Sequence, residues 1–446
     1  MRFSELEGAR VGVWGAGRET SSLAAQLSRR LPAARIAVAA FDRPPEGGAE
    51  PFPGAQVVGP QDAAQALVSC DVVVRSPGVS IHRPELRALR ERGVPVTTAT
   101  SLWLAERGGR DVIGVTGTKG KSTTAALAAH LARGAGRDVE LAGNIGRPAL
   151  DLLDAPPGQL AVVELSSYQI ADLAAGPQVA VVTNLYREHV DWHGSEEVYR
   201  AEKLRLLDLP EVRVAVLPAR QPELAQASSV AERVTFGAPP GWDTGPAGLE
   251  KQGRLRIPAR DLPLPGEHNA LNVCAALSAL AAAGVPEPPL PQALAGFAPL
   301  EHRLQTIATD DGLTWVNDSI STTPESTLAA LASFPGRELV LLAGGQDRGQ
   351  DYDALGAELA RLGATVIGLP STGPRLLSAA RAAGLSDSLA LAAEDLAGAV
   401  ALARSRAGRG AVILLSPAAP SYDHYRDFEE RGEMFRTLLE PGSSPP

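Results

Sequence analysis

Short apolar segments alternate with alanine-rich, helix-like segments along the whole chain, and this alternation constrains the fold more than any other feature. Residues 10–14, 35–41 and 71–74 are three such apolar segments near the N-terminus. Strands that alternate with helices are typical of α/β proteins with mostly parallel sheets. At 446 residues the chain is too long for one ordinary domain. We therefore predict several α/β domains.

Three blocks of strands divide the sequence. In the first, over residues 1–107, the strands end in glycine-rich or charged turns, which is typical of a Rossmann-like domain. The second block, over residues 108–300, begins with the apolar segment 111–115, and the third covers residues 301–446. We predict one domain for each block.

Composition excludes several classes of function. The formal charge of -9 disfavours a nucleic-acid or membrane surface, because both of these partners favour a basic face. Residues 1–7 do not look like a secretory signal, and nowhere do roughly 18 apolar residues run unbroken. Cys70 and Cys274 follow no metal-ligand spacing. We expect a soluble, cytoplasmic protein with no nucleic-acid partner and no membrane insertion.

One segment has the order of a phosphate-binding loop. Gly114-Val-Thr-Gly-Thr-Lys-Gly-Lys-Ser-Thr123 follows an apolar strand and precedes an alanine-rich helix. Glycines let backbone N–H groups turn toward phosphates, and the helix N-terminus adds positive potential. Lys121 is placed to reach the outer phosphates, and Ser122 to offer its hydroxyl to Mg²⁺. The strict pattern needs glycine at position 115, which is valine, so a glycine-rich turn with a chance match stays open as the alternative.

Three other residues are candidates for the same site. Glu164 follows the predicted strand 160–163, where a carboxylate can hold Mg²⁺ beside a phosphate loop, although such a glutamate is as often a helix cap. His189 alone is more often a hydrogen-bonded structural residue than a ligand. Lys203 alone would be a solvated helix residue.

Lysine is unusually scarce. It occurs only at positions 119, 121, 203 and 251, whereas arginine supplies the other 38 of the 42 basic residues. A coding bias toward arginine explains the surface, but lysine alone offers a compact ammonium that can also act as an amine. The lysines that remain, apart from Lys251 in a polar loop, are therefore candidates for a chemical role.

A set of motifs covers nearly the whole chain in a fixed order. They are Thr116-Gly-Thr-Lys-Gly-Lys-Ser122, Gly143-Asn-Ile-Gly146, Glu164-Leu-Ser-Ser-Tyr-Gln169, the pair His189 and Lys203, Gly266-Glu-His-Asn-Ala-Leu-Asn272, His302-Arg303, Asn317-Asp-Ser319, Ser416-Pro-Ala-Ala-Pro-Ser421 and Phe428-Glu-Glu-Arg-Gly432. In combination they resemble the Mur ligases of peptidoglycan synthesis, most closely the MurD-type branch that adds glutamate.

The resemblance implies three domains and a reaction. A Rossmann-like domain would hold the UDP moiety, a central P-loop ATPase-like domain would bind ATP, and a C-terminal Rossmann-like domain would bring glutamate. ATP would phosphorylate the alanine carboxylate of UDP-N-acetylmuramoyl-L-alanine, and the amine of D-glutamate would attack the acyl phosphate. Two Mg²⁺ ions and Lys121 would neutralise the phosphates. We expect a monomer.

The resemblance also assigns site residues. It implies catalytic roles for Lys121, His189 and Lys203, with Lys203 carbamylated to orient the second metal, and metal ligation by Ser122, Glu164, His189 and Lys203. ATP would contact Gly117, Thr118, Lys119, Gly120, Lys121, Ser122, Thr123, Asn269, Asn272, Arg303 and Asp318. The UDP substrate would contact Asp42, Arg43, Ser76, Gly78, Asn144, Ser166 and Gln169, and glutamate would contact Thr322, Arg348, Ser421 and Phe428.

The sequence departs from the family pattern at a few positions. Where family members usually have an asparagine in the phosphate loop, this chain has Lys119, which adds a cation near the phosphates. In the amino-acid domain, this chain has Ile320 and Arg348 at two positions where family members usually have lysine. Arginine does not substitute freely for lysine in a carboxylate pocket. These changes keep L-glutamate open as the alternative to D-glutamate.

Two other classes of protein are also open. Gly15-Ala16-Gly17 suggests a nicotinamide-dependent dehydrogenase, but the third glycine of that fingerprint would fall at Thr20. A non-catalytic P-loop switch would hydrolyse a nucleotide without needing an amino acid. The Mur ligase interpretation accounts for more of the chain than either.

Overall fold

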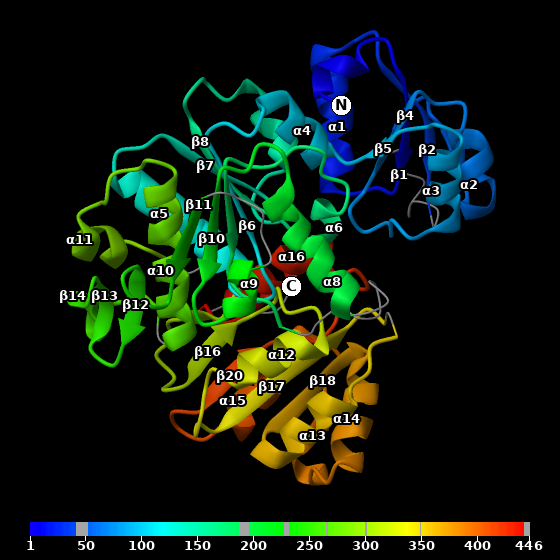
Figure 1. Cartoon of the computed structure of the whole chain (residues 1–446). Helices are drawn as coiled ribbons and strands as arrows, with labels where there is room; N and C mark the ends of the chain where they lie inside the picture. The colour runs from blue at the N-terminus through cyan, green and yellow to red at the C-terminus, as the bar shows by residue number, and fades with distance from the viewer. Residues whose placement is uncertain are drawn as a thin grey trace. The chain divides into compact units, whose positions relative to one another are not determined.

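The computed structural model describes residues 1–41, 52–186, 196–226, 232–264, 266–298, 301–347 and 349–440. The chain forms two compact units, Met1–Phe297 and Ala298–Pro446 (Figure 1). Each unit is built from helices and mostly parallel sheets.

The first sheet of unit 1 has five parallel strands in the order β3-β2-β1-β4-β5. Its strands are β1 (Arg10–Trp14), β2 (Arg35–Ala40), β3 (Gln56–Val58), β4 (Val72–Arg75) and β5 (Val96–Thr97), and its helices are η1 (Phe3–Leu6), α1 (Arg18–Arg30), α2 (Pro60–Leu67), α3 (Pro84–Glu91) and α4 (Ala99–Arg107). The chain order reverses between β1 and β4. In open α/β sheets that reversal opens a crevice at the carboxyl ends of the strands, where ligands bind.

The central sheet of unit 1 has six parallel strands in the order β11-β10-β9-β6-β8-β7. They are β6 (Val112–Thr116), β7 (Val139–Gly143), β8 (Leu160–Glu164), β9 (Val179–Val182), β10 (Val214–Pro218) and β11 (Glu232–Phe236). All residues of β6, β8, β9 and β10 are buried, which is why these strands read as continuous apolar runs.

Helices and a small antiparallel sheet complete unit 1. The helices are α5 (Lys121–Gly134), η3 (Ala149–Asp154), α6 (Ser167–Ile170), α8 (Glu196–Leu204), η4 (Arg205–Asp208), α9 (Pro222–Gln226), η5 (Ala259–Asp261), α10 (Glu267–Ala282) and α11 (Leu290–Ala295). The small sheet contains β12 (Trp242–Gly245), β13 (Gly248–Lys251) and β14 (Arg254–Pro258). The alanine-rich helices α5 and α10 pack against each other, because small side chains allow two helices to approach closely.

Unit 2 has one six-stranded sheet in the order β15-β16-β20-β17-β18-β19, parallel except for β15. Its strands are β15 (Gln305–Ile307), β16 (Thr314–Asn317), β17 (Leu339–Gly345), β18 (Thr365–Ser371), β19 (Ala390–Ala392) and β20 (Val412–Leu415). Its helices are α12 (Pro324–Leu331), α13 (Asp353–Leu362), α14 (Gly373–Ala382), η6 (Asp387–Leu389), α15 (Leu396–Arg406) and α16 (Phe428–Thr437).

Strand β17 shows how the sequence places two cores around this sheet. Leu339 and Leu341 belong to one apolar cluster, whereas Val340 and Leu342 belong to another. Successive side chains of a strand point to opposite faces, so an unbroken apolar run requires helices on both sides.

Three large α/β sheets, one in each predicted domain, confirm the predicted fold class. The predicted domain limits near residues 107 and 300 stay predictions; the first two sheets share one compact unit. Within the described residues, no helix is both long and apolar enough to cross a membrane.

Candidate active site

The loop between β6 and α5 depends on two glycines. Gly117 has φ +142° and Gly120 has φ +79°, conformations that side chains disfavour. A Cβ atom on Gly117 would lie 1.9 Å from Thr183 Oγ1, and one on Gly120 would lie 2.3 Å from Asn272 Oδ1. Space as well as backbone angle therefore requires glycine at both positions of the predicted phosphate loop.

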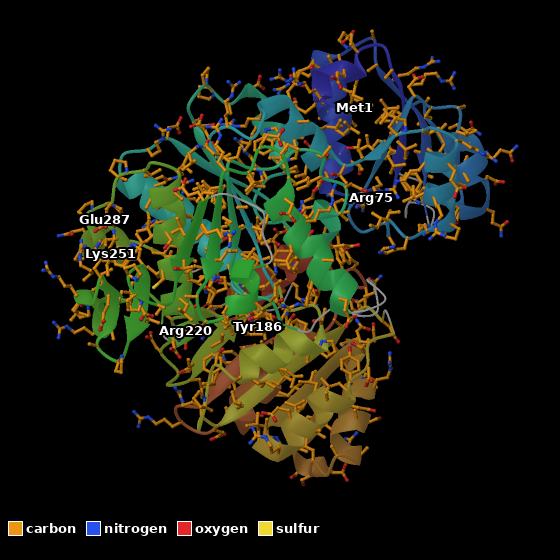
Figure 2. All side chains as sticks on the ribbon, in the orientation of Figure 1. Met1, Arg75, Tyr186, Arg220, Lys251 and Glu287 are labelled. Carbon is orange, nitrogen blue, oxygen red and sulfur yellow. The ribbon has the colours of Figure 1, made fainter. Side chains whose placement is uncertain are left out.

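The segment after β9 holds this loop in shape. The backbone oxygen of Asn184 accepts from Thr118 N at 2.9 Å, and its side-chain Oδ1 accepts from Lys119 N at 2.8 Å. Thr183 Oγ1 donates to the Lys119 carbonyl at 2.6 Å, and Tyr186 N (labelled in Figure 2) donates to Thr118 Oγ1 at 2.9 Å. Asn184 was not among the residues predicted from the sequence, although its place two residues after a strand beside β6 was a usable signal.

The first turn of α5 carries the predicted phosphate ligands. Lys121 is half-buried, and its Nζ donates to the Thr118 carbonyl at 2.9 Å, so the ammonium lies over the loop. Ser122 and Thr123 are buried in the same turn. A helix N-terminus beside a glycine loop favours anions, because its free N–H groups and its dipole point outward.

Glu164, at the carboxyl end of β8, presents a buried oxygen to this region. It pairs in register with Val115 of the neighbouring strand β6, and its side chain is 1% exposed. Its Oε1 accepts a hydrogen bond of 3.0 Å from Asn144 Nδ2, whereas its Oε2 has no hydrogen-bond partner among the described residues. A buried carboxylate oxygen without a donor is costly, so this arrangement fits a cation ligand.

Magnesium suits these residues better than a metal held entirely by protein. Among the described residues, no group of three or more histidine, cysteine, aspartate or glutamate side chains could enclose a metal. Mg²⁺ usually takes one or two carboxylates together with waters and substrate phosphates. Ser122 and Glu164 fit that donor set. His189, predicted for a second metal, lies outside the described residues.

Lys203 lies in the last turn of α8 and is buried, with 2% of its surface exposed. Its Nζ donates to the Gly117 carbonyl at 2.9 Å, which brings it to the phosphate loop. The ordinary interpretation of Lys203 as a solvated helix residue is therefore wrong. Burial raises the pKa of the neighbouring Glu202 to about 7.

Two asparagines of α10 lie beside the same loop. Asn272 Oδ1 accepts from Thr124 Oγ1 of α5 at 3.3 Å, and Asn272 Nδ2 donates to Asn269 Oδ1 at 3.3 Å. The structure thus brings together the phosphate loop, Glu164, Lys203, Asn269 and Asn272. Their roles toward ATP stay predictions.

The residues predicted beside the muramoyl-alanine end lie on the loops after β7 and β8. Asn144 follows β7 and donates to Glu164, as described above. Ser166 caps α6, and the Ser166 N and Oγ both donate to Gln169 Oε1 at 2.9 Å. Gln169 is buried and also donates to Glu19 of α1, a contact that the sequence analysis did not foresee.

The predicted uridine rim lies at the reversal of strand order in the first sheet. Ser76 follows β4, and its N donates to the Trp14 carbonyl at the end of β1 at 2.7 Å. Gly78 lies in the same turn. Asp42 and Arg43, the other two predicted rim residues, lie outside the described residues.

Arg75, labelled in Figure 2, joins the first sheet to the central part of unit 1. It is fully buried, pairs through Nε with Asp172, and donates to the Tyr168 carbonyl at 2.7 Å and the Val79 carbonyl at 2.8 Å. Because Ser76 is the next residue, this anchor fixes the start of the predicted rim. Arg75 was not among the residues predicted from the sequence.

In unit 2, three loops meet at the carboxyl ends of β16, β20 and β17. The Ala418 N donates to the Ser321 carbonyl at 3.0 Å, and the Gln346 N donates to the Pro420 carbonyl at 2.8 Å. Of the predicted glutamate-pocket residues, Thr322 and Ser421 lie on these loops, and Phe428 begins α16, where its carbonyl accepts from Ser319 Oγ at 2.8 Å. Arg348 lies outside the described residues.

A buried arginine holds two of these loops. Arg431 of α16 is 1% exposed and donates to Ser319 Oγ at 3.0 Å, to the Ser319 carbonyl at 2.9 Å and to the Ala419 carbonyl at 3.2 Å. It forms no ion pair within the part of the chain that the structure describes. Burial lowers the pKa of its guanidinium to about 10. The motif Phe428–Gly432 contained Arg431, but the sequence analysis gave it no role.

The other two residues predicted to contact ATP also belong to unit 2. Asp318 is buried, and it accepts from Leu304 N at 3.1 Å and from Ser416 Oγ at 2.8 Å. Burial raises the pKa of Asp318 to about 6. Arg303 is half-buried. Their contact with the nucleotide stays a prediction.

Comparison with known proteins identifies the family. A model described as the Mur ligase middle domain matches residues 115–280, and one described as the Mur ligase glutamate ligase domain matches residues 302–419. A relative from Xanthomonas campestris pv. campestris (strain 8004) is 41% identical, with 98% of this chain and 96% of the relative covered. The chain belongs to the Mur ligase family. It is therefore an ATP-dependent, amide-bond-forming ligase of peptidoglycan-type cell-wall synthesis.

A solved Mur ligase has the same fold. The crystal structure of MurF ligase from Thermotoga maritima in complex with ADP covers 99% of this chain, and 97% of the MurF chain is covered, with a TM-score of 0.58 and 18% identity. At that identity the likeness concerns the fold alone.

The relatives correct the expected amino acid. The Xanthomonas protein is named UDP-N-acetylmuramoyl-L-alanine–L-glutamate ligase, and so is a Micromonospora relative that is 42% identical, with 98% of this chain and 97% of that protein covered. Our expectation of D-glutamate is therefore wrong. The phosphate-loop motifs serve ATP chemistry that does not depend on the stereochemistry of the amino acid, and only departures such as Ile320 and Arg348 signalled a different pocket.

Proposed function

We propose that this Mur ligase joins L-glutamate to UDP-N-acetylmuramoyl-L-alanine at the expense of ATP. The observation that carries the proposal is similarity over nearly the full length to relatives from two genera, both named for this reaction. The phosphate loop with Lys121, together with the buried Glu164, supports the ATP-dependent part of it.

The phosphate loop would bind and orient ATP. Backbone N–H groups from Gly117 to Thr123 would cradle the phosphates, and Lys121 would turn from the Thr118 carbonyl to the outer phosphate oxygens. Asn269 and Asn272, which line the loop, would contact the nucleotide, together with Arg303 and Asp318 of unit 2. Magnesium bound to Ser122 and Glu164 would neutralise charge on the transferring phosphoryl group.

The reaction would pass through an acyl phosphate. A carboxylate oxygen of the substrate's alanine attacks the γ-phosphorus of ATP, and ADP leaves. The neutral amine of L-glutamate then attacks the acyl carbon, phosphate leaves with the bridging oxygen, and the amine loses a proton. Phosphorylation is needed because a carboxylate oxygen is otherwise a very poor leaving group.

A second magnesium would be held by His189 and by a carbamate on Lys203. A carbamate forms when a neutral primary amine attacks CO₂ and loses a proton, which converts a cation into an anion. Lys203 is buried against the phosphate loop, which supports this assignment. A carbamate at this position would lie close to the ATP phosphates and would help to hold a metal beside them. Arginine could not form the carbamate.

The two substrates would bind at the carboxyl ends of the other sheets. The UDP moiety would contact Ser76 and Gly78, with Asp42 and Arg43, and its alanyl end would reach Asn144, Ser166 and Gln169. L-glutamate would enter the pocket of Thr322, Arg348, Ser421 and Phe428. We expect the enzyme to act as a cytoplasmic monomer.

Phosphate release tests the proposal. The protein is given Mg²⁺ and ATP, and UDP-N-acetylmuramoyl-L-alanine and L-glutamate are omitted one at a time. We expect release above background only in the complete mixture, and at least about tenfold less when D-glutamate replaces L-glutamate. Release without an amino acid would instead support a nucleotide switch, and equal rates with both enantiomers would refute selectivity for L-glutamate.

A further inference from the structure

The first turn of α1 reaches two loops of the central sheet. Glu19 is only 8% exposed, and its Oε1 accepts a hydrogen bond of 2.6 Å from Gln169 Nε2. The neighbouring Arg18 donates from its two terminal nitrogens to the backbone oxygens of Asn144 and Gly146, each at 3.0 Å. One helical turn of the first domain therefore contacts the loops after both β7 and β8.

The Gln169 amide is fixed at both ends by this arrangement. Its Nε2 donates to Glu19, and its Oε1 accepts from the Ser166 N and Oγ. Thr100 Oγ1 donates to the same Glu19 oxygen at 3.0 Å, and both Thr100 and Gln169 are 1% exposed. Hydrogen bonds to a buried carboxylate are strong, and the donors would be costly to leave unpaired, so Gln169 has one favoured orientation.

The two loops carry the residues that surround the proposed reaction. Asn144 donates to Glu164, and Ser166 lies two residues after Glu164. Helix α1 begins directly after the turn Gly15–Gly17. This turn packs against Ser76 of the predicted uridine rim. The same turn of helix thus adjoins both ends of the path that a UDP-linked substrate would follow.

We propose that Glu19 is a positioning residue of the ligase and that, with Arg18, it sets the spacing between the uridine rim and the site of acyl-phosphate formation. This inference rests on the proposed function for its substrate. Glu19 itself contacts none of the proposed reacting groups; it acts through Gln169. A misplacement of about 1 Å between reacting groups can lower a rate by about 10²-fold, so its loss affects turnover more than binding.

The kinetic test compares Glu19→Ala with Glu19→Gln. Alanine removes the acceptor for Gln169, and we expect kcat to fall about tenfold while KM for ATP stays unchanged, because the phosphate loop is untouched. Glutamine keeps an oxygen that can accept from Gln169, so it should restore most of the rate. Glu106→Ala is the matched control: Glu106 also accepts two hydrogen bonds, from Ser4 N and Oγ at 2.8 Å, and its loss should leave kcat unchanged.

A double-mutant cycle tests whether Glu19 acts through Gln169. In a Gln169→Ala background, Glu19→Ala should lower kcat by less than about twofold further, because contacting residues are not additive. Fully additive losses, a KM for ATP that rises in parallel with the fall in kcat, or a Glu19→Gln variant as slow as Glu19→Ala would each overturn the inference.

Amide hydrogen exchange on the full chain separates this inference from the proposed function. Glu19→Ala should speed exchange in residues 166–170 relative to wild type and to Glu19→Gln, with or without ligation activity. If wild type fails to ligate L-glutamate but this difference appears, the proposed function falls and the contact between α1 and the loop stands. Unchanged exchange in Glu19→Ala would refute the positioning role even in an active enzyme.

Discussion

The phosphate loop of unit 1 and the three loops at the predicted glutamate site of unit 2 are built in different ways. In the phosphate loop, backbone conformation and close packing decide the residue: a side chain at Gly117 or Gly120 would collide with Thr183 or Asn272. At the predicted glutamate site of unit 2, the loops are joined by backbone hydrogen bonds and by the buried Arg431, whose guanidinium donates to Ser319 and Ala419.

This difference decides what a motif can reveal. Glycines that are required at fixed positions leave a recognisable motif, so the sequence indicated ATP even with valine at position 115. An amino-acid site formed by side chains on three separate loops leaves no such motif. The prediction of the stereochemistry of glutamate was therefore wrong.

Lys121→Ala should lower phosphate release by about 10³-fold, because it removes the cation that would stabilise charge on the transferring phosphoryl group. Steady-state phosphate release with all substrates measures the effect. Lys251→Ala is the control: Lys251 of β13 pairs with Glu287, which follows α10, and its loss should not change the rate (Figure 2). Full activity in Lys121→Ala would remove the phosphate-loop assignment.

Lys203→Ala should lower kcat roughly 10²-fold, because a group that organises a metal contributes about that much. If the lysine acts as a carbamate, a small carboxylate such as acetate should restore part of the rate by supplying the missing anion. Wild-type rates in the variant would contradict the carbamate assignment. Lys203→Arg, which keeps a cation but cannot be carbamylated, should remain as slow as alanine.

Arg431→Lys should raise KM for L-glutamate about tenfold, because lysine cannot reproduce the fork of hydrogen bonds to Ser319 and Ala419. KM for ATP should change by less than about twofold, because the substitution leaves the phosphate loop of unit 1 unchanged. Arg436→Lys on the same helix is the control, since Arg436 is exposed. Equal increases in both constants would show that Arg431 supports unit 2 as a whole and not the pocket.

Asp318→Asn should stabilise the protein at pH 8 and leave its stability nearly unchanged at pH 4. Burial raises the pKa of Asp318 from 3.8 to about 6. Below pH 4 the side chain is protonated in both the folded and the unfolded protein. As the pH rises through 6, the buried carboxyl must ionise, and the free energy of unfolding falls by up to about 3 kcal/mol. Urea unfolding of both variants at the two pH values measures it, and a destabilised variant at pH 8 would contradict the sign.

Much of the fold could be predicted from the sequence because its buried strands are unbroken apolar runs. β6, β8 and β9 each follow from such a run, and the alternation of strands and helices predicted a parallel sheet with the phosphate loop at the carboxyl end of β6. The antiparallel edge strand β15 was not predicted, because three residues between charged turns leave no clear period.

The site could be predicted only where a short sequence motif is typical of one chemical function. Glu164 was found because it ends a strand next to the phosphate loop. Asn184, Arg75, Glu19 and Arg431 were missed because their partners are distant in sequence: Gln169 lies 150 residues after Glu19, and Ser319 lies 112 residues before Arg431. Such contacts exist only after the sheets have packed.

The most direct test of the central claim is competition between the glutamate enantiomers. The protein is incubated with ATP, Mg²⁺, UDP-N-acetylmuramoyl-L-alanine and racemic glutamate, and the purified product is hydrolysed for chiral analysis of its glutamate. We predict that the glutamate in the product is L almost exclusively. A product that contains mainly D-glutamate, or both enantiomers in equal amounts, would contradict the account.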